Sequence, residues 1–204
     1  MKNLSCPNCG TECPILLELV KVVTCRSCGT TLMVHDAHVT LAGEQGEMHD
    51  APHLFGIGDR VQLGQTSTLI LGHARYSYGR GFWDEFCGVA GAGGSCWISV
   101  DEGDVVRQVR LRGQDAPKFK PPFKPGETLD FDAATFTVSE VETAECIALR
   151  GQVDEVIQVG ETHEFVNASA GDDALLSGEF WDDNALWFYG RWYDPFDVKV
   201  DRQS

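Results

Sequence analysis

From Phe55 onward, apolar and polar residues alternate along the chain with the two-residue period of a β-strand. In TFTVSE (135–140), Phe136 and Val138 fall on one face and the hydroxyl residues on the other, and FDVKVD (196–201) alternates similarly. Other short runs rich in β-branched and aromatic residues recur roughly every 8–12 residues, between Gly, Asp and Asn. No amphipathic helix of three turns is visible. The pattern predicts a mostly β body of antiparallel strands, arranged as barrels or a sandwich.

A weak internal repeat divides this body. FGIGDRV (55–61) and FKPGETL (123–129) share the pattern Phe-x-x-Gly-acid-x-aliphatic, and a strand pattern follows each. The intervening stretch APKFKPPFKPG contains four prolines, which is typical of an extended connector. We therefore expect two related units that could also pack as one domain. Their predicted bounds are 55–115 for the first unit, 116–126 for the connector and 127–204 for the second unit.

The first 35 residues contain the metal-site pattern CPNCG (6–10) and CRSCG (25–29), two Cys-x-x-Cys pairs separated by fifteen residues. Two thiolates on a tight turn can hold one side of a tetrahedral ion, and the Gly after each pair tolerates the unusual dihedrals of that turn. So short a segment cannot bury enough surface alone, so the metal would supply most of its folding free energy. We predict a zinc ribbon over 1–35 with one structural Zn²⁺, held by Cys6, Cys9, Cys25 and Cys28.

The remaining residues near the ribbon carry weaker signals. Cys13 is expected to be a spare or buried thiol, because four thiolates already close a structural site. Residues 36–54 lack a sustained period and are rich in Gly, Ala, acids and His, so we expect a linker with at most one short ordered piece. The nearby histidines could in principle form a second metal site, but their irregular spacing favours solvent exposure; they are His35, His38, His49 and His53.

Charge is distributed unevenly. The chain has a net charge of -15, and residues 125–204 carry eighteen acidic side chains against four basic ones. Because phosphate neutralisation dominates DNA affinity, this excess makes nucleic acid an unlikely partner. The apolar run at 15–23 is short and is interrupted by Glu18 and Lys21, so neither a signal peptide nor a membrane span is predicted. We expect a cytoplasmic protein whose eight cysteines are thiols or metal ligands.

The segment GFWDEF (81–86) places two acids side by side, which raises the question of an acidic active site. In a strand, Asp84 would point to one face and Trp83 and Glu85 to the other. The adjacent pair could then not act on one bond, and a partner acid would have to come from Asp182 or Asp183, if the fold brings the echo GEFWDD (178–183) close. Glu85 is expected either to be buried and to accept a hydrogen bond from a Trp indole or backbone N–H, or to belong to an exposed aromatic-acidic patch that binds a partner.

Four segments give the body a family likeness. They are FGIGDRVQLG, LGHARYSYGRGFWDEF, SCWISVDEGD and FKPGETLDF, in this order. Together they resemble the bacterial domain-of-unknown-function family numbered 4178, over about 55–200 of this chain. The likeness is carried best by Gly58 with Asp59, by residues 83–86 and by Trp97.

Two positions depart mildly from the family pattern. Ile98 follows Trp97 where Leu is usual, and Cys87 with Gly88 follows the acidic pair where a more apolar strand would be expected. The resemblance implies no catalytic residue and no substrate. It does imply an accessory role in a membrane-associated stress system, because members are often encoded beside membrane-stress coat proteins, small membrane proteins and enzymes resembling polyamine aminopropyltransferases. N-terminal zinc ribbons are also known in such proteins.

These observations favour a non-catalytic adaptor or binding protein. Its expected partner is another protein, for which a membrane-associated protein is one candidate, and its acidic second half could also attract a cationic ligand such as a polyamine. The alternative is a hydrolase-type enzyme that uses Asp84 and Glu85 with the C-terminal acids. No catalytic or cofactor-binding residue is assigned. The candidate binding or fold-signature residues are Trp83, Asp84, Glu85 and Trp97.

Overall fold

The computed structural model describes residues 2–35, 39–49, 51–91, 93–171, 173–182 and 184–202. Within these ranges the chain is mostly β, which confirms the predicted class. The strands are β1 (Lys2–Ser5), β2 (Glu12–Ile15), β3 (Val22–Thr24), β4 (Thr30–Val34), β5 (Val39–Glu44), β6 (Arg60–Leu63), β7 (Thr66–Ser77), β8 (Phe82–Ala90), β9 (Ser95–Asp101), β10 (Asp104–Leu111), β11 (Thr128–Phe131), β12 (Ala134–Val153), β13 (Thr162–Ala170), β14 (Ala174–Trp181), β15 (Asn184–Tyr193) and β16 (Lys199–Asp201). The helices in the described part of the chain are the 3-10 turns η1 (Gly113–Asp115) and η2 (Pro195–Asp197), and neither could cross a membrane.

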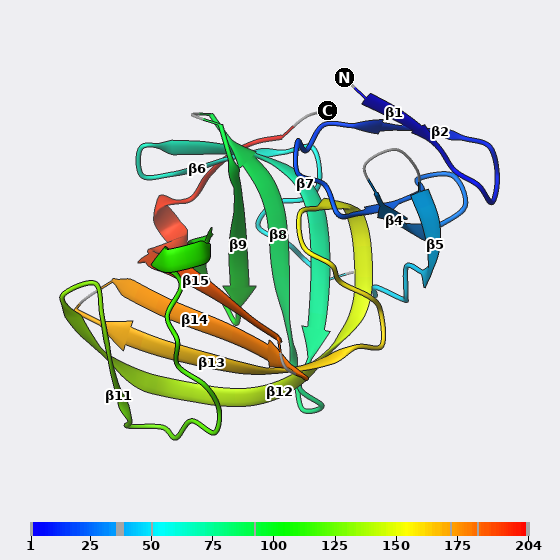
Figure 1. Cartoon of the computed structure of the whole chain (residues 1–204). Coiled ribbons are helices and arrows are strands. Elements are labelled where there is room, and N and C mark those ends of the chain that lie inside the picture. The colour runs from blue at the N-terminus through cyan, green and yellow to red at the C-terminus, as the bar shows by residue number, and fades with distance from the viewer. Residues whose placement is uncertain are drawn as a thin grey trace.

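Eight of these strands close into one antiparallel barrel (Figure 1). Strands β7 to β10 form one meander and β12 to β15 form another. Pairing of β10 with β15 and of β7 with β12 joins the meanders at both edges. The two predicted units therefore contribute four strands each to a single closed wall.

The repeated Gly–acid segments occupy equivalent places beside the two meanders. The Gly58 N–H donates to the Ile70 carbonyl at 2.9 Å, and the Gly126 N–H donates to the Val138 carbonyl at 2.8 Å. In both cases the N–H of the strand residue donates back to the carbonyl of the acid after the glycine, at 3.0 and 2.8 Å. Both glycines have positive φ, +98° and +86°, which explains why the pattern requires Gly there.

The N-terminal ribbon is docked on the barrel. Strand β3 pairs with the last residues of β12, and the side chain of Gln152 accepts from the N–H groups of Leu16 and Leu17 at 2.9 and 3.2 Å. Ribbon residues such as Leu17 and Val22 belong to the same buried cluster as Trp97 inside the barrel. The ribbon and the barrel interior thus share one hydrophobic core.

The segment predicted as a linker is more ordered than its composition suggested. Strand β5 pairs with β4 at the edge of the ribbon, and the Gln45 carbonyl accepts from the Leu149 N–H at 2.9 Å. The Arg150 guanidinium also donates to the Gln45 and Gly46 carbonyls, at 2.5 and 2.9 Å. Backbone carbonyls can make these bonds whatever the side chains are, which is why composition gave no signal for them.

The outer wall of the barrel is covered by the segments that precede each meander. Phe55 and β6 pack on Ile70, Phe86 and Ile98. Phe123 and β11 pack on the outer residues of β12 to β15, including Phe136, Leu176 and Trp187. Because these apolar residues face outward, the alternate positions on each strand face the barrel interior, where the site described next lies.

Candidate functional site

The barrel contains a cavity of about 280 Å³ whose walls combine aromatic and acidic side chains. Its aromatic residues are Tyr78, Trp83, Phe165 and Trp192; its acids are Glu85, Asp101, Asp104, Glu140 and Glu142; the others are Ser99, Val106, Gln108, Asn167, Leu175 and Ser177. Among these lining residues there is no Lys, Arg or His. Negative charge and aromatic faces therefore occur together, and both attract organic cations.

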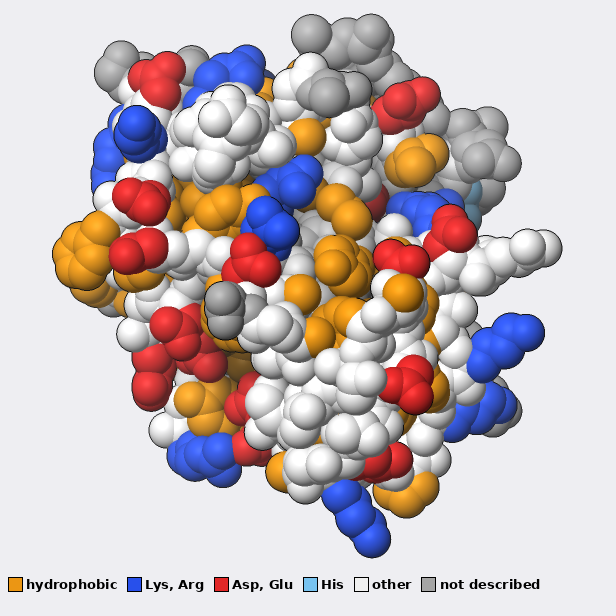
Figure 2. Space-filling view, turned by 90° about the vertical axis from the view of Figure 1, so that its left-hand side faces the viewer, with side chains coloured by type: hydrophobic (Ala, Val, Ile, Leu, Met, Phe, Trp, Pro, Cys, Tyr) orange, Lys and Arg blue, Asp and Glu red, His pale blue; other side chains and the backbone are white. Residues whose placement is uncertain are grey.

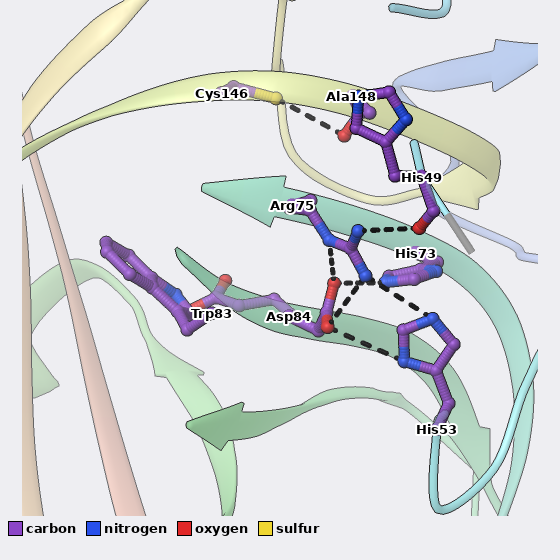
Figure 3. A network of polar contacts seen from close by, with 9 residues as sticks. His49, His53, His73, Arg75, Trp83, Asp84, Cys146 and Ala148 are labelled. Carbon is purple, nitrogen blue, oxygen red and sulfur yellow. Dashed lines mark hydrogen bonds and ion pairs between the residues drawn. The ribbon is translucent and has the colours of Figure 1, made fainter. Parts of the chain in front are cut away.

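Strand β8 places Glu85 in this cavity and Asp84 outside it. Figure 3 shows the side chains of Trp83 and Asp84 leaving β8 on opposite sides, as strand alternation requires. Trp83 stacks on Tyr76 with ring centroids 5.2 Å apart and lines the cavity. The adjacent carboxylates therefore do not converge on one point.

Glu85 is a buried acid with a single hydrogen bond. Its side chain is 7% exposed, and its Oε1 accepts from the Trp83 indole N–H at 3.1 Å. Burial, with a smaller contribution from the charge of Glu179, raises the pKa of Glu85 to about 8. The indole hydrogen bond opposes this shift but does not cancel it. Glu85 thus combines the burial and indole contact expected for a structural acid with a position in a pocket.

The acid that approaches Glu85 comes from the echo segment. Glu179 on β14 lies two positions beyond Ser177, which lines the cavity, so both point inward. Glu179 is buried, and its Oε2 lies 3.9 Å from Nδ1 of His163. The prediction that Asp182 or Asp183 supplies the partner acid is not supported: Asp182 is exposed in a turn, and Asp183 lies outside the described residues. The sequence signal that could have identified Glu179 is strand alternation: Leu176 and Phe180 share one face of β14, so Glu179 must point to the other face.

Two acceptor atoms of residues that line the cavity have no hydrogen-bond partner among the residues that the structure describes. Gln108 is 4% exposed, and its Oε1 is a buried acceptor without a donor. Oδ1 of Asp101 is also a buried acceptor for which the described residues supply no donor. Both residues line the cavity. Because buried polar groups are nearly always satisfied, these oxygens require an N–H or O–H donor, which an ordered water or a ligand would supply.

Trp97 lies at the closed end of the barrel, near the ribbon. It is buried, and its indole N–H donates to Oδ1 of Asp154 at 3.0 Å. Arg110 donates to Oε2 of Glu155 at 2.5 Å close by. Trp97 is therefore a packing residue that anchors the segment after β12, and it does not line the cavity.

Asp84 belongs to a buried polar cluster on the outer wall (Figure 3). Its carboxylate accepts from Arg75 at 2.8 and 3.1 Å, and Nε2 of His73 lies 2.7 Å from Oδ1. Nδ1 of His53 lies 3.5 Å from Oδ2. Burial alone would raise the pKa of Asp84, but the contacts with His73 and Arg75 outweigh it and hold the pKa below its ordinary value. The expectation that His53 is solvent-exposed is wrong, because this packing half-buries it.

His53, His73 and Asp84 are close enough to be considered as metal ligands, since their ligand atoms lie within 4.8 Å of one another. The guanidinium of Arg75, however, contacts both carboxylate oxygens and already supplies the positive charge there. Arg75 also donates to the His49 carbonyl at 3.0 Å. We therefore interpret the cluster as a latch that holds the segment before Phe55 against the barrel.

The ribbon brings its four predicted ligands together. The Sγ atoms of Cys6 and Cys28 are 3.8 Å apart, those of Cys9 and Cys25 are 3.7 Å apart, and all four lie within 4.8 Å of one another. This cluster is compatible with a metal site.

The two knuckles of the ribbon have matching backbones. In each, the N–H of the glycine donates to the carbonyl of the first cysteine, at 2.8 Å for Gly10 and 2.9 Å for Gly29. Both glycines have positive φ, +76° and +71°. The contact with the Thr30 hydroxyl lowers the pKa of Cys28 to about 6, whereas burial raises the pKa of Cys6 to about 11, so the metal-free cysteines differ in their tendency to form the thiolate.

The other candidate residues near the ribbon lie outside this cluster. Cys13 is buried, and its Sγ contacts the Thr11 carbonyl at 3.8 Å. His35 is exposed and contacts the Thr40 hydroxyl, whereas His38 lies outside the described residues. Neither Cys13 nor His35 belongs to the group of four ligands.

Comparison with known proteins gives one match. A search of curated proteins and a search of solved structures each found no match. A family model, described as a domain of unknown function (DUF4178), matches residues 56–195, which include the whole barrel. The chain therefore belongs to the DUF4178 family.

Proposed function

We propose that this protein is a non-catalytic binding protein that holds a small cationic ligand, such as a polyamine, inside its barrel. The observation that carries the proposal is the cavity itself: acids and aromatic faces line it, no basic residue is among the lining residues, and the Gln108 oxygen lacks a donor. An ammonium group would supply charge, N–H donors and a cation for the rings at once.

The charge of the whole molecule supports the same ligand class. The net charge is -15, and Figure 2 shows a dense group of Asp and Glu side chains at the lower left of that face. Such a field raises the local concentration of cations and speeds their association. It would oppose the entry of carboxylates and phosphates.

We further propose that the ribbon holds one structural Zn²⁺. With a Zn–S distance of about 2.3 Å, four thiolates in a tetrahedron would lie about 3.8 Å apart. The measured contacts of 3.7 and 3.8 Å fit that geometry. None of the eight cysteines forms a disulfide, which agrees with the cytoplasmic location that we propose. Four thiolates leave no open position on the ion, so its role would be structural.

Calorimetric titration with 1,4-diaminobutane tests the proposal. We expect binding of the diamine and none of 1,4-butanediol or succinate, which have the same carbon chain without the positive charge. Ser99→Phe, which fills the cavity, should abolish binding. Thr128→Phe adds the same ring to the exposed strand β11 and should leave binding unchanged. Equal binding of the diol, or full binding by Ser99→Phe, would reject the cavity as a cation site.

If the cavity binds the diamine, removing an acidic charge that lines the cavity should weaken binding more than removing one elsewhere. Glu140 lines the cavity, whereas Glu145, on the same strand, does not. Glu140→Gln should weaken diamine binding about tenfold, or about 1.4 kcal/mol, and Glu145→Gln should not. Equal effects of the two changes would indicate a general field and no specific site.

A hydrolase is the second candidate, and the raised pKa of Glu85 in a cavity is the observation that favours it. Glu179 would be its partner acid, because Asp84 faces the outer wall. A panel of nitrophenyl glycosides, esters and phosphates tests this candidate. Turnover by the parent that is lost in Glu85→Gln would support an enzyme and contradict the non-catalytic proposal.

The accessory role in a membrane-stress system, with a protein partner, rests on the family likeness. Affinity capture with the intact protein from its native cell tests it, with Ser99→Phe as the control. A partner lost with Ser99→Phe would connect the adaptor role to the cavity. A partner retained by both forms would place the contact elsewhere on the chain.

A further inference from the structure

We propose that the cavity exchanges a proton on Glu85 for its cationic ligand, so that ligand binding is coupled to pH. This inference rests on the proposed function, because it requires a cation to enter the cavity. It adds a regulatory property: the protein would hold its ligand at neutral to alkaline pH and release it on acidification.

Within the described part of the chain, the immediate surroundings of Glu85 contain no counter-charge for a carboxylate. Its hydrogen-bond donor is the neutral indole of Trp83. The titratable groups that interact with it electrostatically are neutral or acidic: Tyr76 from β7, Cys146 from β12 and Glu179 from β14. The other titratable groups that line the same cavity are Tyr78, Asp101, Asp104, Glu140 and Glu142, and none of them is basic. His163 from β13 faces Glu179, and Arg110 from β10 is paired with Glu155.

A buried carboxyl group in such surroundings is more stable with its proton than without it. The pKa of Glu85 is raised to about 8, so roughly 90% of the empty protein would carry that proton at pH 7. An ammonium ion beside Glu85 would reverse the preference by supplying the missing charge. The carboxylic acid would lose its proton to the buffer, and the carboxylate would pair with the ligand.

The unpaired oxygen of Gln108 indicates independently that a donor belongs in the cavity that Glu85 lines. Gln108 is almost fully buried, and its Oε1 lacks a partner among the described residues. A primary ammonium group has three N–H donors, and a diamine has two such groups, so N–H donors would be present for both Gln108 and the ionised Glu85. A quaternary ammonium group has no N–H and would supply none.

Calorimetry in buffers of different ionisation enthalpy measures the exchange directly. With 1,4-diaminobutane at pH 7.0, the dependence of the observed heat on the buffer should correspond to release of nearly one proton per ligand bound. The affinity should rise about tenfold between pH 7 and pH 9 and level off there, because Glu85 is then already ionised. Tetramethylammonium should bind more weakly than the diamine and serves as the donor-free probe.

Glu85→Gln is the decisive variant. It should bind the diamine more weakly, release no proton and show a flat affinity from pH 6 to pH 9. Glu145→Gln, whose side chain does not line the cavity, should behave as the parent. Folding of Glu85→Gln can be checked by its thermal transition at pH 9, which should be no lower than that of the parent because an ionised buried group has been removed.

Two results would overturn the inference, and they are distinguishable. Diamine binding without proton release, with the same pH profile in Glu85→Gln, would reject the exchange while leaving cation binding in place. No diamine binding at any pH from 6 to 9 would reject the proposed function and the exchange with it.

Discussion

Asp84 and Glu85 are neighbours in the chain with opposite surroundings. Asp84 pairs across the strands with Arg75 and also contacts His73, and these contacts lower its pKa. Glu85 has one neutral donor and a second acid nearby, and its pKa is raised. The same residue class therefore stabilises the outer wall at one position and leaves a chargeable group in the cavity at the next.

Removing the Asp84 carboxylate should destabilise the fold. Asp84→Asn leaves Arg75, which is 3% exposed, without its counter-ion, and breaking a buried pair in this way costs about 3–5 kcal/mol. Because the folded-state pKa of Asp84 is lowered, its contribution is fully present above the ordinary Asp pKa and is lost as pH falls through the folded value. Urea unfolding at pH 7 and pH 3 should show the difference from the parent shrinking at the lower pH.

Asp173→Asn is the matched control for that prediction. It breaks the exposed ion pair with Arg191, whose atoms lie 3.1 Å apart, and should change stability by less than about 1 kcal/mol. Equal effects of Asp84→Asn and Asp173→Asn would show that the latch does not stabilise the barrel.

At the scale of elements, β12 joins the parts of the molecule. Its first half pairs with β13, its middle pairs with β7 to close the barrel, and its last residues pair with β3 of the ribbon. Close approach at the β7–β12 seam requires glycine. A Cβ on Gly72 would lie 2.2 Å from the Gln152 carbonyl oxygen, and one on its partner Gly151 would lie 2.1 Å from the Leu71 oxygen.

Gly72→Ala should therefore weaken the seam, because backbone atoms would have to move apart. We expect a loss of at least about 2 kcal/mol in the free energy of unfolding. Gly56→Ala is the control, since a Cβ there meets no atom within 4 Å and the residue is not in the left-handed region. Chemical denaturation measures both; equal stability of the two variants would mean that the seam tolerates the displacement.

At the scale of the whole molecule, the ribbon and the barrel share one hydrophobic core. Cys6 and Cys25 belong to the same buried cluster as Tyr76 and Trp97, without a break at the domain boundary. Loss of the metal that we propose for the ribbon should therefore change side-chain packing in the barrel as well as near the cysteines.

Cys25→Ser, or chelation of the metal, should lower the stability of the entire chain. We expect loss of one Zn²⁺ per chain by elemental analysis and a fall of about 6–12 °C in Tm, the shift for a loss of roughly 3 kcal/mol in a protein of this size. Near-ultraviolet circular dichroism should report altered packing of the barrel tryptophans. Cys13→Ala, which removes a buried thiol that is not a ligand, should retain the metal. Unchanged barrel signals after metal loss would show that the two parts fold independently.

Local patterns in the sequence were sufficient for the clustering of the four ribbon cysteines, the β class and the opposite directions of Asp84 and Glu85. These features depend on residues that lie within a few positions of each other, on a turn or along one strand. The Gly–acid repeat was visible for the same reason, because each copy is a single turn.

Closure of the barrel, and the site inside it, were decided only by tertiary structure. Pairing of β7 with β12 joins residues at least 70 positions apart, and no local periodicity records such a contact. The approach of Glu179 to Glu85, the latch at His53 and the docking of the ribbon all depend on that pairing. Sequence by itself determined which way each side chain leaves its strand, whereas the closed sheet decided which of those directions is the inside, and hence where the acids meet.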